Sequence, residues 1–300
     1  MLIDNLKAFT AVATAGSFSR AAEMLHLTQP AVSKRVAALE EELGRRLFDR
    51  IGRQVSLTEA GRVLLPQARR ILLDLEETRR LLDSLSDRVE GPLVLATSHH
   101  IGLRRLPPVL KAFARQYPAV ELDIRFMDSE DACRFAEQGL VDLAVVTLPE
   151  RPSPLLSCRV IWDDPLVPMA APDHDLTRGD ITPQRLNAHA AILPPAGTFT
   201  RGLVERAFLP LGIAPARILE TNYLETIQMM VGIGLGWGVL PLSMGESLQR
   251  LALEGLTMER SLGWVTHRER TRSNAATALI RLLEAQRAMS GRLSDFPPLG

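Results

Sequence analysis

The sequence contains little of what defines several other protein classes. It has only two cysteines, Cys133 and Cys158, in 300 residues, which excludes a disulfide-rich secreted scaffold and favours a reducing cytosol. Aromatic residues make up 5%, and 35 basic residues are balanced by 35 acidic ones. A chain without net charge does not bind nucleic acid over its whole surface. The hydrophobic fraction of 46% nevertheless excludes an intrinsically disordered chain.

Targeting and membrane signals are scarce as well. The first charged residue is Asp4, and the N-terminal segment lacks the basic and apolar regions of a signal peptide. One uncharged stretch, 226–245, has the length of a membrane span. Its five glycines and Pro241 interrupt it too often for one helix, so it predicts a helix, a glycine turn and a short strand. We therefore expect a cytoplasmic protein with no membrane partner.

The first 57 residues predict three short helices followed by a hairpin. Apolar residues recur at helical spacing after Asp4, and Gly16 marks the end of the first helix. Ser17 is the expected N-cap of the second helix and Thr28 that of the third, where Pro30 fits the first turn. This pattern is typical of a helix-turn-helix unit, whose last helix enters the DNA major groove by its N-terminal end. A small helical bundle with surface charges is the alternative interpretation.

The third helix begins with side chains that suit DNA recognition. Gln29 can form two hydrogen bonds with an adenine edge, and Ser33 can contact a base or a phosphate. Two basic residues after Ser33 can neutralise phosphates, and two arginines of the hairpin can follow the backbone or the minor groove. Segment 1–57 has eight basic and six acidic residues, a net charge of +2. The candidate DNA-binding residues are Ser17, Thr28, Gln29, Pro30, Ser33, Lys34, Arg35, Arg50 and Arg53.

The chain strongly resembles the LysR-type transcriptional regulators in the segments LKAF (6–9), GSFSRAA (16–22), LTQPAVS (27–33), LFDR (47–50) and LTEAG (57–61). The resemblance implies an α/β multidomain protein with an N-terminal winged helix-turn-helix, a linker helix and a periplasmic-binding-protein-like domain of two α/β subdomains. It implies a regulator of transcription, with no enzymatic activity and no cofactor. The implied partners are double-stranded promoter DNA, a small-molecule effector, further copies of the chain in a dimer of dimers, and RNA polymerase.

The expected domains follow from this organisation. We place the winged helix-turn-helix DNA-binding domain at 1–57, the linker and dimerisation helix at 58–89 and the effector-binding domain at 90–300. Within the last domain, lobe I covers about 90–161 and 267–290, and lobe II covers about 162–266. The two crossings between the lobes are expected near Ile161-Trp162 and near Val265-Thr266.

The linker carries a heptad seam. Beyond Thr58, the expected N-cap, apolar residues step by four and three alternately and are flanked by charged residues. A narrow apolar stripe favours contact between two chains, although a helix packed on its own domain can show the same stripe. The candidate dimerisation residues are Leu64, Ala68, Ile71, Leu75 and Leu82.

From Leu93 onwards, short apolar strands alternate with helical patterns, which predicts an α/β architecture. In open α/β sheets, ligands bind beyond the carboxyl ends of the strands, and helix N-termini there attract anions. Segment 97–102 follows the first strand, Thr147 ends another, and segment 198–200 precedes a helix expected from Gly202. Serine and threonine also cap helices, so a structural role is the alternative for each.

By resemblance, Ser98, His100, Thr147 and Thr200 fall where family members bind their effectors. The hydroxyl pattern looks most like that of the regulators of sulfur metabolism, which hold small oxyanions. A small anion or a short carboxylate is therefore the expected effector. The candidate effector-binding residues are Thr97, Ser98, His99, His100, Ile101, Thr147, Thr198, Thr200 and Asn222.

Other chemistries have weaker support. His99 and His100 are adjacent and point apart, with no third ligand at helical spacing, so no metal site is expected. The glycines between 232 and 238 resemble a dinucleotide fingerprint, but they follow a predicted helix, which favours a structural turn. A redox-sensing regulator that uses Cys133 and Cys158 stays an alternative. A small-molecule-binding or enzymatic α/β protein is the alternative of another class, although no catalytic constellation supports it.

Overall fold

The computed structural model describes residues 2–51, 54–84 and 88–293. It divides into two compact units, Met1–Leu85 and Ser86–Gly300. None of the helices in these ranges combines the length and the apolar character that a membrane crossing requires. Each unit has a hydrophobic core of its own.

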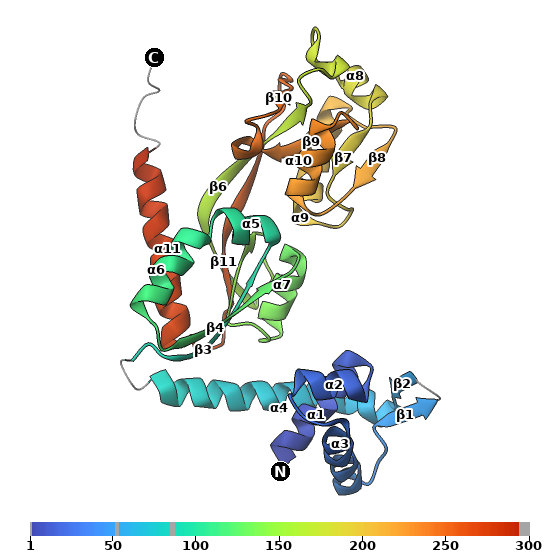
Figure 1. Cartoon of the computed structure of the whole chain (residues 1–300), viewed down its shortest axis with the longest axis vertical. Helices are drawn as coiled ribbons and strands as arrows, with labels where there is room; N and C mark the ends of the chain where they lie inside the picture. Colours follow the sequence, from blue (N-terminus) through green and yellow to red (C-terminus); the bar gives the residue numbers. More distant parts are fainter. Residues whose placement is uncertain (1, 52–53, 85–87, 294–300) are drawn as a thin grey trace. The chain divides into compact units, whose positions relative to one another are not determined.

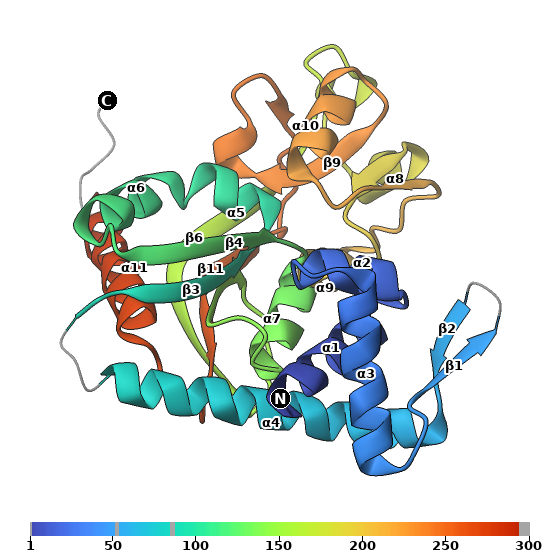
Figure 2. The same ribbon diagram turned by 60° about the horizontal axis from the view of Figure 1, so that its bottom comes forward.

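The first unit is a helix-turn-helix with a hairpin wing and a long helix (Figure 2). Ser17 accepts a hydrogen bond from the backbone N–H of Arg20, and Thr28 accepts one from that of Ala31, so both act as the expected N-caps. Gly44 ends the third helix in the left-handed conformation, with φ of 62°, as glycine readily does. The elements are α1 (Leu2–Ala15), α2 (Phe18–Met24), α3 (Gln29–Leu43), β1 (Phe48–Ile51), β2 (Gln54–Leu57) and α4 (Glu59–Ser84).

The core of this unit reaches into α4 and changes the interpretation of the linker seam. Ala68 is fully buried among the apolar residues of α1 to α3, and Leu64 packs against the same cluster. The expectation that Ala68 contacts a second chain is therefore wrong, because its own unit already covers it. Ile71 is 48% exposed and Leu75 is half-buried; both remain candidates for a contact between chains. The side chain of Leu82 lies outside the described residues.

The second unit contains, in its described residues, a nine-stranded sheet in the order β4-β3-β5-β11-β6-β9-β7-β8, with β10 paired to β6. We call β3 to β5 with α5 to α7 and α11 lobe I, and β7 to β10 with α8 to α10 lobe II (Figure 1). The strands are β3 (Gly91–Thr97), β4 (Val120–Phe126), β5 (Leu143–Thr147), β6 (Leu156–Ala170), β7 (Ala191–Leu193), β8 (Ile218–Glu220), β9 (Trp237–Pro241), β10 (Gln249–Arg250) and β11 (Met258–His267). The helices are α5 (His99–Arg104), α6 (Pro107–Gln116), α7 (Ser129–Glu137), α8 (Pro183–Ala188), α9 (Phe199–Phe208), α10 (Leu224–Gly232) and α11 (Asn274–Leu293).

Two long antiparallel strands, β6 and β11, connect the lobes (Figure 1). In lobe I, β11 pairs with β5 through residues 262–265, and in lobe II, β6 pairs with β9 through residues 166–169. Between these segments Asp164 lies opposite Arg260 in the register. The crossings therefore lie near 163–165, directly after the expected Ile161-Trp162, and near 259–261, a few residues before the expected Val265-Thr266. Continuous strands that belong to both lobes give the sequence no break at the crossing.

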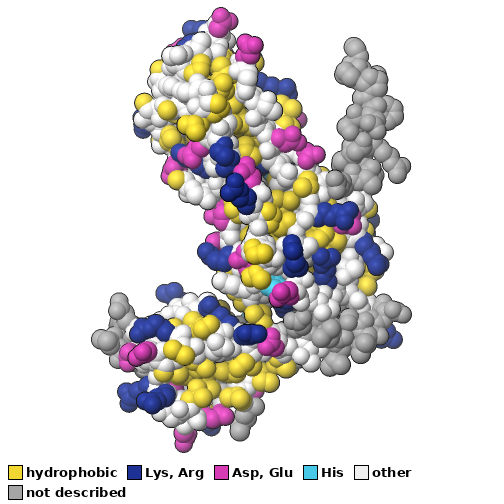
Figure 3. Space-filling view, turned by 180° about the vertical axis from the view of Figure 1, so that it is seen from behind, with side chains coloured by type: hydrophobic (Ala, Val, Ile, Leu, Met, Phe, Trp, Pro, Cys, Tyr) yellow, Lys and Arg dark blue, Asp and Glu magenta, His cyan; other side chains and the backbone are white. Residues whose placement is uncertain are grey.

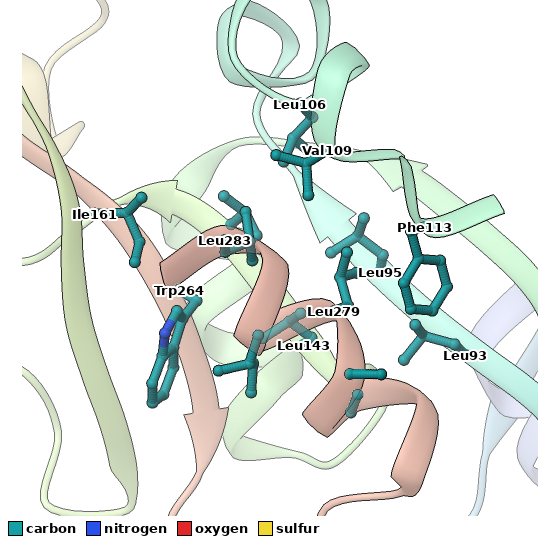
Figure 4. Close-up of a cluster of buried hydrophobic side chains, with 14 of the residues drawn as sticks. Leu93, Leu95, Leu106, Val109, Phe113, Leu143, Ile161, Trp264, Leu279 and Leu283 are labelled. Atoms are coloured by element: carbon teal, nitrogen blue, oxygen red, sulfur yellow. The ribbon is translucent and has the colours of Figure 1, made fainter. Parts of the chain in front are cut away.

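Helices α6 and α11 cover one face of lobe I. Leu106 and residues of α6 meet β3, β5 and α11 in one apolar cluster (Figure 4). Trp264 of β11 is also buried there. In lobe II, Trp237 is fully buried against Phe208. The glycine turn before β9 is structural, as expected: a Cβ atom at Gly236 would lie 2.2 Å from the carbonyl oxygen of Ala190.

Candidate functional sites

A cavity of ≈ 100 Å³ lies in the second unit between the two lobes. Four helices begin at its wall: α5 and α7 of lobe I, and α9 and α10 of lobe II. Seven of the predicted effector-binding residues line it, namely Ser98, His99, His100, Thr147, Thr198, Thr200 and Asn222. Hydroxyl-bearing residues at the ends of β3 and β5 and at the start of α9 thus meet at one cavity.

Two predicted effector residues do not line this cavity. Thr97 is fully buried and donates its hydroxyl hydrogen to the carbonyl oxygen of Val145 at 2.8 Å. Ile101 belongs to the apolar core of lobe I. Thr97 is the last residue of β3 and is bonded within the sheet. Ile101 lies in α5, which begins at His99 and turns one face to the core. Helix α9 likewise begins at Phe199, earlier than the expected Gly202.

The sequence analysis missed the charged centre of the site. Arg260 is 5% exposed and donates from Nε to Asp164 Oδ2 at 2.7 Å and from Nη1 to Thr200 Oγ1 at 3.2 Å. Asp164, 1% exposed, also accepts a hydrogen bond from Arg105 Nη2 at 3.2 Å. Burial lowers the pKa of Arg260, and the charge of Asp164 opposes this shift. Because a guanidinium stays protonated at neutral pH, two arginines share one carboxylate and leave a net positive charge beside the cavity.

A signal for this pair was present in the strand pattern. Arg260 falls at the same alternating register as Met258 and Leu262, which are buried. Asp164 holds the corresponding place between Trp162 and Leu166. A charged residue at an apolar register position predicts a buried ion pair. The partner across the sheet could not be read from the sequence.

Helix N-termini add to the positive potential. The N-caps of α7 and α10, Asp128 and Tyr223, make no side-chain capping hydrogen bond, so backbone N–H groups of both helices are free of a cap. Helix α9 differs, because its Phe199 N–H donates to Glu130 Oε1 of lobe I at 2.5 Å. The N-termini of helices attract anions. Both N-termini therefore add to the positive potential at the cavity wall, and acidic residues in their first turns partly offset it.

His100 is buried beside this centre, and burial followed by the charge of Arg260 lowers its pKa. Its Nδ1 lies 3.5 Å from Glu225 Oε1 of lobe II. Both effects favour the neutral imidazole, and the charges of Asp164 and Glu225 oppose them. His99 is exposed and packs edge-on against Phe126 and Tyr223. Among the described residues, no three His, Cys, Asp or Glu side chains are grouped as a metal ion would need.

We expect the chain to lose stability as the pH falls below about 6.5. The folded state lowers the pKa values of His100 and His174, so the unfolded chain takes up more protons below the ordinary histidine pKa. Stability is therefore fully present above that pH and is lost as the pH falls through the folded pKa values. The midpoint of thermal unfolding should be lower at pH 5.5 than at pH 7.5. His174→Asn retains a side-chain acceptor for the Leu176 N–H and should reduce the difference between the two midpoints. If the difference is the same in His174→Asn, the loss of stability at low pH does not come from His174.

The DNA-reading end of α3 is accessible in the first unit. Gln29 is exposed, and its Nε2 donates to Ser33 Oγ at 2.9 Å. The hydroxyls of Ser17 and Thr28 act as helix caps. Pro30 and Lys34 are exposed and Arg35 is half-buried. The side chain of Arg50 and the whole of Arg53 lie outside the described residues.

The basic residues of this unit are dispersed on the face that Figure 3 shows. On the face seen in Figure 3, Lys and Arg side chains alternate with hydrophobic and acidic ones and form no continuous basic patch among the residues described there. The sequence analysis also missed Glu40, whose Oε1 accepts hydrogen bonds from the backbone N–H groups of Leu47 and Phe48 at 2.7 and 3.3 Å. This acidic residue holds the start of the wing against α3.

Family models match both units. The model described as "Bacterial regulatory helix-turn-helix protein, lysR family" matches residues 3–62, and the one described as "LysR substrate binding domain" matches residues 86–288. The chain belongs to the LysR family. This regulator is 33% identical to the "RuBisCO operon transcriptional regulator" of Allochromatium vinosum over 91% of its own length and 92% of that protein.

Solved structures agree with the family assignment. A full-length OxyR variant from Pseudomonas aeruginosa matches with a TM-score of 0.67 and 25% identity, over 96% of this regulator and 95% of that chain. Full-length CbnR complexed with its target DNA has the same fold, with a TM-score of 0.63 and 23% identity over 97% and 100% of the two chains. The LysR-family regulator is thus a DNA-binding transcription factor with an effector-binding domain, and not an enzyme.

The two thiols of the regulator are poor candidates for redox sensing. Burial, and next the neighbouring Cys158, raise the pKa of Cys133 to about 12. Burial also raises the pKa of Cys158, although Arg268 opposes the shift. Peroxide reacts with the thiolate, so a raised pKa slows oxidation.

We expect Cys133 to resist thiol reagents and peroxide in the folded protein at pH 7. The measurement is labelling by a thiol reagent, followed over hours and located by peptide mass analysis. The urea-unfolded chain, in which both thiols should react promptly, is the control. Labelling of Cys133 at the same rate in the folded and unfolded chain would restore the redox hypothesis.

Proposed function

We propose that the protein is a sequence-specific DNA-binding regulator whose effector, a small anion or short carboxylate, binds in the cavity between the lobes. The observation that supports this most is the Arg260–Asp164–Arg105 group. Arg260 is 5% exposed and shares Asp164 with Arg105, which is 31% exposed, so the carboxylate does not fully neutralise the two cations. A partly buried, incompletely neutralised guanidinium interacts favourably with an anion. The free N-termini of α7 and α10 favour the same ligand class.

The acidic residues of the cavity do not cancel this charge. Asp128 is exposed, so water screens it. Glu130 accepts the Phe199 N–H at the start of α9 and is balanced by the positive end of that helix. Glu225 lies in the first turn of α10 and 3.9 Å from Arg104, so the positive end of that helix and a further arginine offset its charge. The acidic groups thus lie where solvent, a helix or a second arginine compensates them.

Both lobes contribute to the cavity, so a bound effector can change how they close. Glu130 of lobe I contacts Phe199 of lobe II, and His100 of lobe I lies beside Glu225 of lobe II. A ligand that binds one closure more tightly shifts the population toward it. In a dimer of dimers, this shift would change subunit packing and thereby the spacing and bending of the bound DNA.

The reading function rests on Gln29 and Ser33 at the start of α3. Pairing of chains through the exposed part of α4 would place two such helices on a pseudo-palindromic site. Segment 1–57, the DNA-binding part of the chain, has a net charge of only +2, so one copy of it alone would bind DNA weakly. We therefore propose that the exposed Ile71 and the half-buried Leu75 belong to the dimer seam.

Isothermal titration of the full chain with sulfate, short carboxylates and neutral aromatics tests the effector class. We expect affinity for the anions, and a loss of at least about tenfold in Arg260→Met, which removes one charge-assisted hydrogen-bond donor. Arg159→Met is the matched control, because Arg159 is an exposed arginine of β6 that pairs with Glu284. Affinity for neutral aromatics alone would refute the proposal.

A further inference from the structure

Several buried polar atoms near the cavity have no hydrogen-bond partner among the described residues. They include Nε2 of His100 and Oε2 of Glu225. The other two atoms of this pair, Nδ1 and Oε1, lie 3.5 Å apart, and Oε1 is also 3.9 Å from Arg104 Nε. His100 is 6% exposed and lines the cavity. Buried polar groups in native proteins are seldom left without a partner. This set therefore indicates a ligand that supplies hydrogen bonds beyond those of an anionic group with Arg260.

The contact with Glu225 sets which nitrogen of His100 carries the hydrogen. A carboxylate can only accept, and Glu225 Oε1 lies 3.5 Å from Nδ1. The favoured tautomer thus has its hydrogen on Nδ1, directed at Glu225. Burial and Arg260 lower the pKa of His100 against the opposing charges of Asp164 and Glu225, which favours the ring with a single hydrogen. Nε2 is left as a buried acceptor on a ring that lines the cavity.

Nε2 of His100, as an acceptor, favours anions that carry a hydrogen-bond donor over anions that carry none. Sulfate and simple carboxylates present only acceptor oxygens at neutral pH, and two acceptors facing one another gain no hydrogen bond. A hydroxyl or a protonated amino group can donate to Nε2 and satisfy it. Sites built to bond a substrate hydroxyl or amine reject analogues that lack this group far more strongly than apolar pockets reject an extra methylene.

We propose that the effector carries both an anionic group, which Arg260 binds, and a hydrogen-bond donor, which His100 accepts, and is thus a hydroxy or amino carboxylate. This inference rests on the proposed function of the cavity and narrows its ligand class. A volume of ≈ 100 Å³, at roughly 10–15 Å³ for each water-sized group, accommodates about seven to ten such groups. A four-carbon dicarboxylate with one such substituent is within this range.

Three probes with one carbon skeleton isolate the donor: succinate, malate and aspartate, which differ only in hydrogen, hydroxyl or ammonium at one carbon. Isothermal titration of the full chain should give an affinity for malate or aspartate at least about tenfold higher than for succinate. Whichever of the two binds more tightly identifies the donor as hydroxyl or ammonium, and either supports the proposal. His100→Leu should bring the ratio close to one while the succinate affinity changes little.

Glu225→Gln provides a second variant that keeps the shape of the side chain. Its amide can donate to Nδ1 and allow the hydrogen to move to Nε2, so the preference for the donor-bearing probe should decrease. Thermal unfolding of each variant checks that it is folded. If His100→Leu does not fold, the three affinities of the wild-type protein still show whether a donor on the probe strengthens binding.

Two results separate this inference from the proposed function. Equal affinity for all three probes, or binding of sulfate without binding of malate or aspartate, overturns the inference and leaves an anionic effector in place. Failure of sulfate and all three carboxylates to bind at millimolar concentration overturns both.

Discussion

Replacing Asp164 by alanine is expected to lower the free energy of unfolding by about 3–5 kcal/mol. Asp164 is 1% exposed and contacts both Arg260 and Arg105. Its loss leaves the Arg260 guanidinium, itself 5% exposed, without a neighbouring carboxylate in the strand crossing. An uncompensated buried charge is among the most destabilising changes that a single substitution produces. Urea unfolding of the full chain, followed by the fluorescence of the buried tryptophans, measures it.

The neighbouring residue supplies a matched control. Asp163 is exposed on the same strand, and Asp163→Ala should change stability by less than about 0.5 kcal/mol. The double variant Asp164→Leu and Arg260→Met replaces the pair by apolar side chains and should recover much of the loss. A cost below about 1 kcal/mol for Asp164→Ala would mean that the pair behaves as a surface ion pair and is not the buried centre of the site.

Replacing Gln29 by alanine is expected to relax the DNA sequence preference by about ten- to a hundredfold, the worth of one bidentate base contact. Gln29 is exposed at the start of α3, and its hydrogen bond to Ser33 Oγ orients the amide before DNA binds. The measurement compares the affinities of the full chain for a specific site and for a scrambled duplex at fixed salt concentration. Binding to the scrambled duplex should change little.

Lys34→Ala serves as the contrasting variant, because Lys34 is exposed one residue beyond Ser33 and is expected to neutralise a phosphate. It should weaken binding to both duplexes alike and reduce the slope of log affinity against log salt by about one. If Gln29→Ala also weakened both duplexes equally, Gln29 would be a backbone contact and not a base-reading residue.

Local signals in the sequence predicted the helix boundaries of the helix-turn-helix correctly. The caps Ser17 and Thr28 and the terminating Gly44 act over three or four residues, so their chemistry is readable without the fold. The hydroxyl-bearing strand ends were predicted as well, because the carboxyl ends of strands meet at one edge of an open α/β sheet.

Long-range pairing could not be predicted in the same way. Arg260 and Asp164 are 96 residues apart and meet only through the register of β6 and β11. The same limit applies to Ala68, where a heptad pattern fits a second chain and the unit's own core equally well. Thr97 ends β3 and its hydroxyl bonds to β5, whereas Ile101 lies on the core face of α5, a short helix in place of the expected loop.

The most direct test of an effector-controlled DNA switch measures the binding of the full chain to DNA from upstream of its own gene. Gel shifts and footprints over a salt series, with and without the tightest anion of the titration panel, should show a salt-sensitive, sequence-preferring complex whose footprint changes with the anion. In Arg260→Met, the complex should form but its footprint should not respond. A complex without sequence preference, or one whose footprint responds equally in both proteins, would contradict control through this cavity.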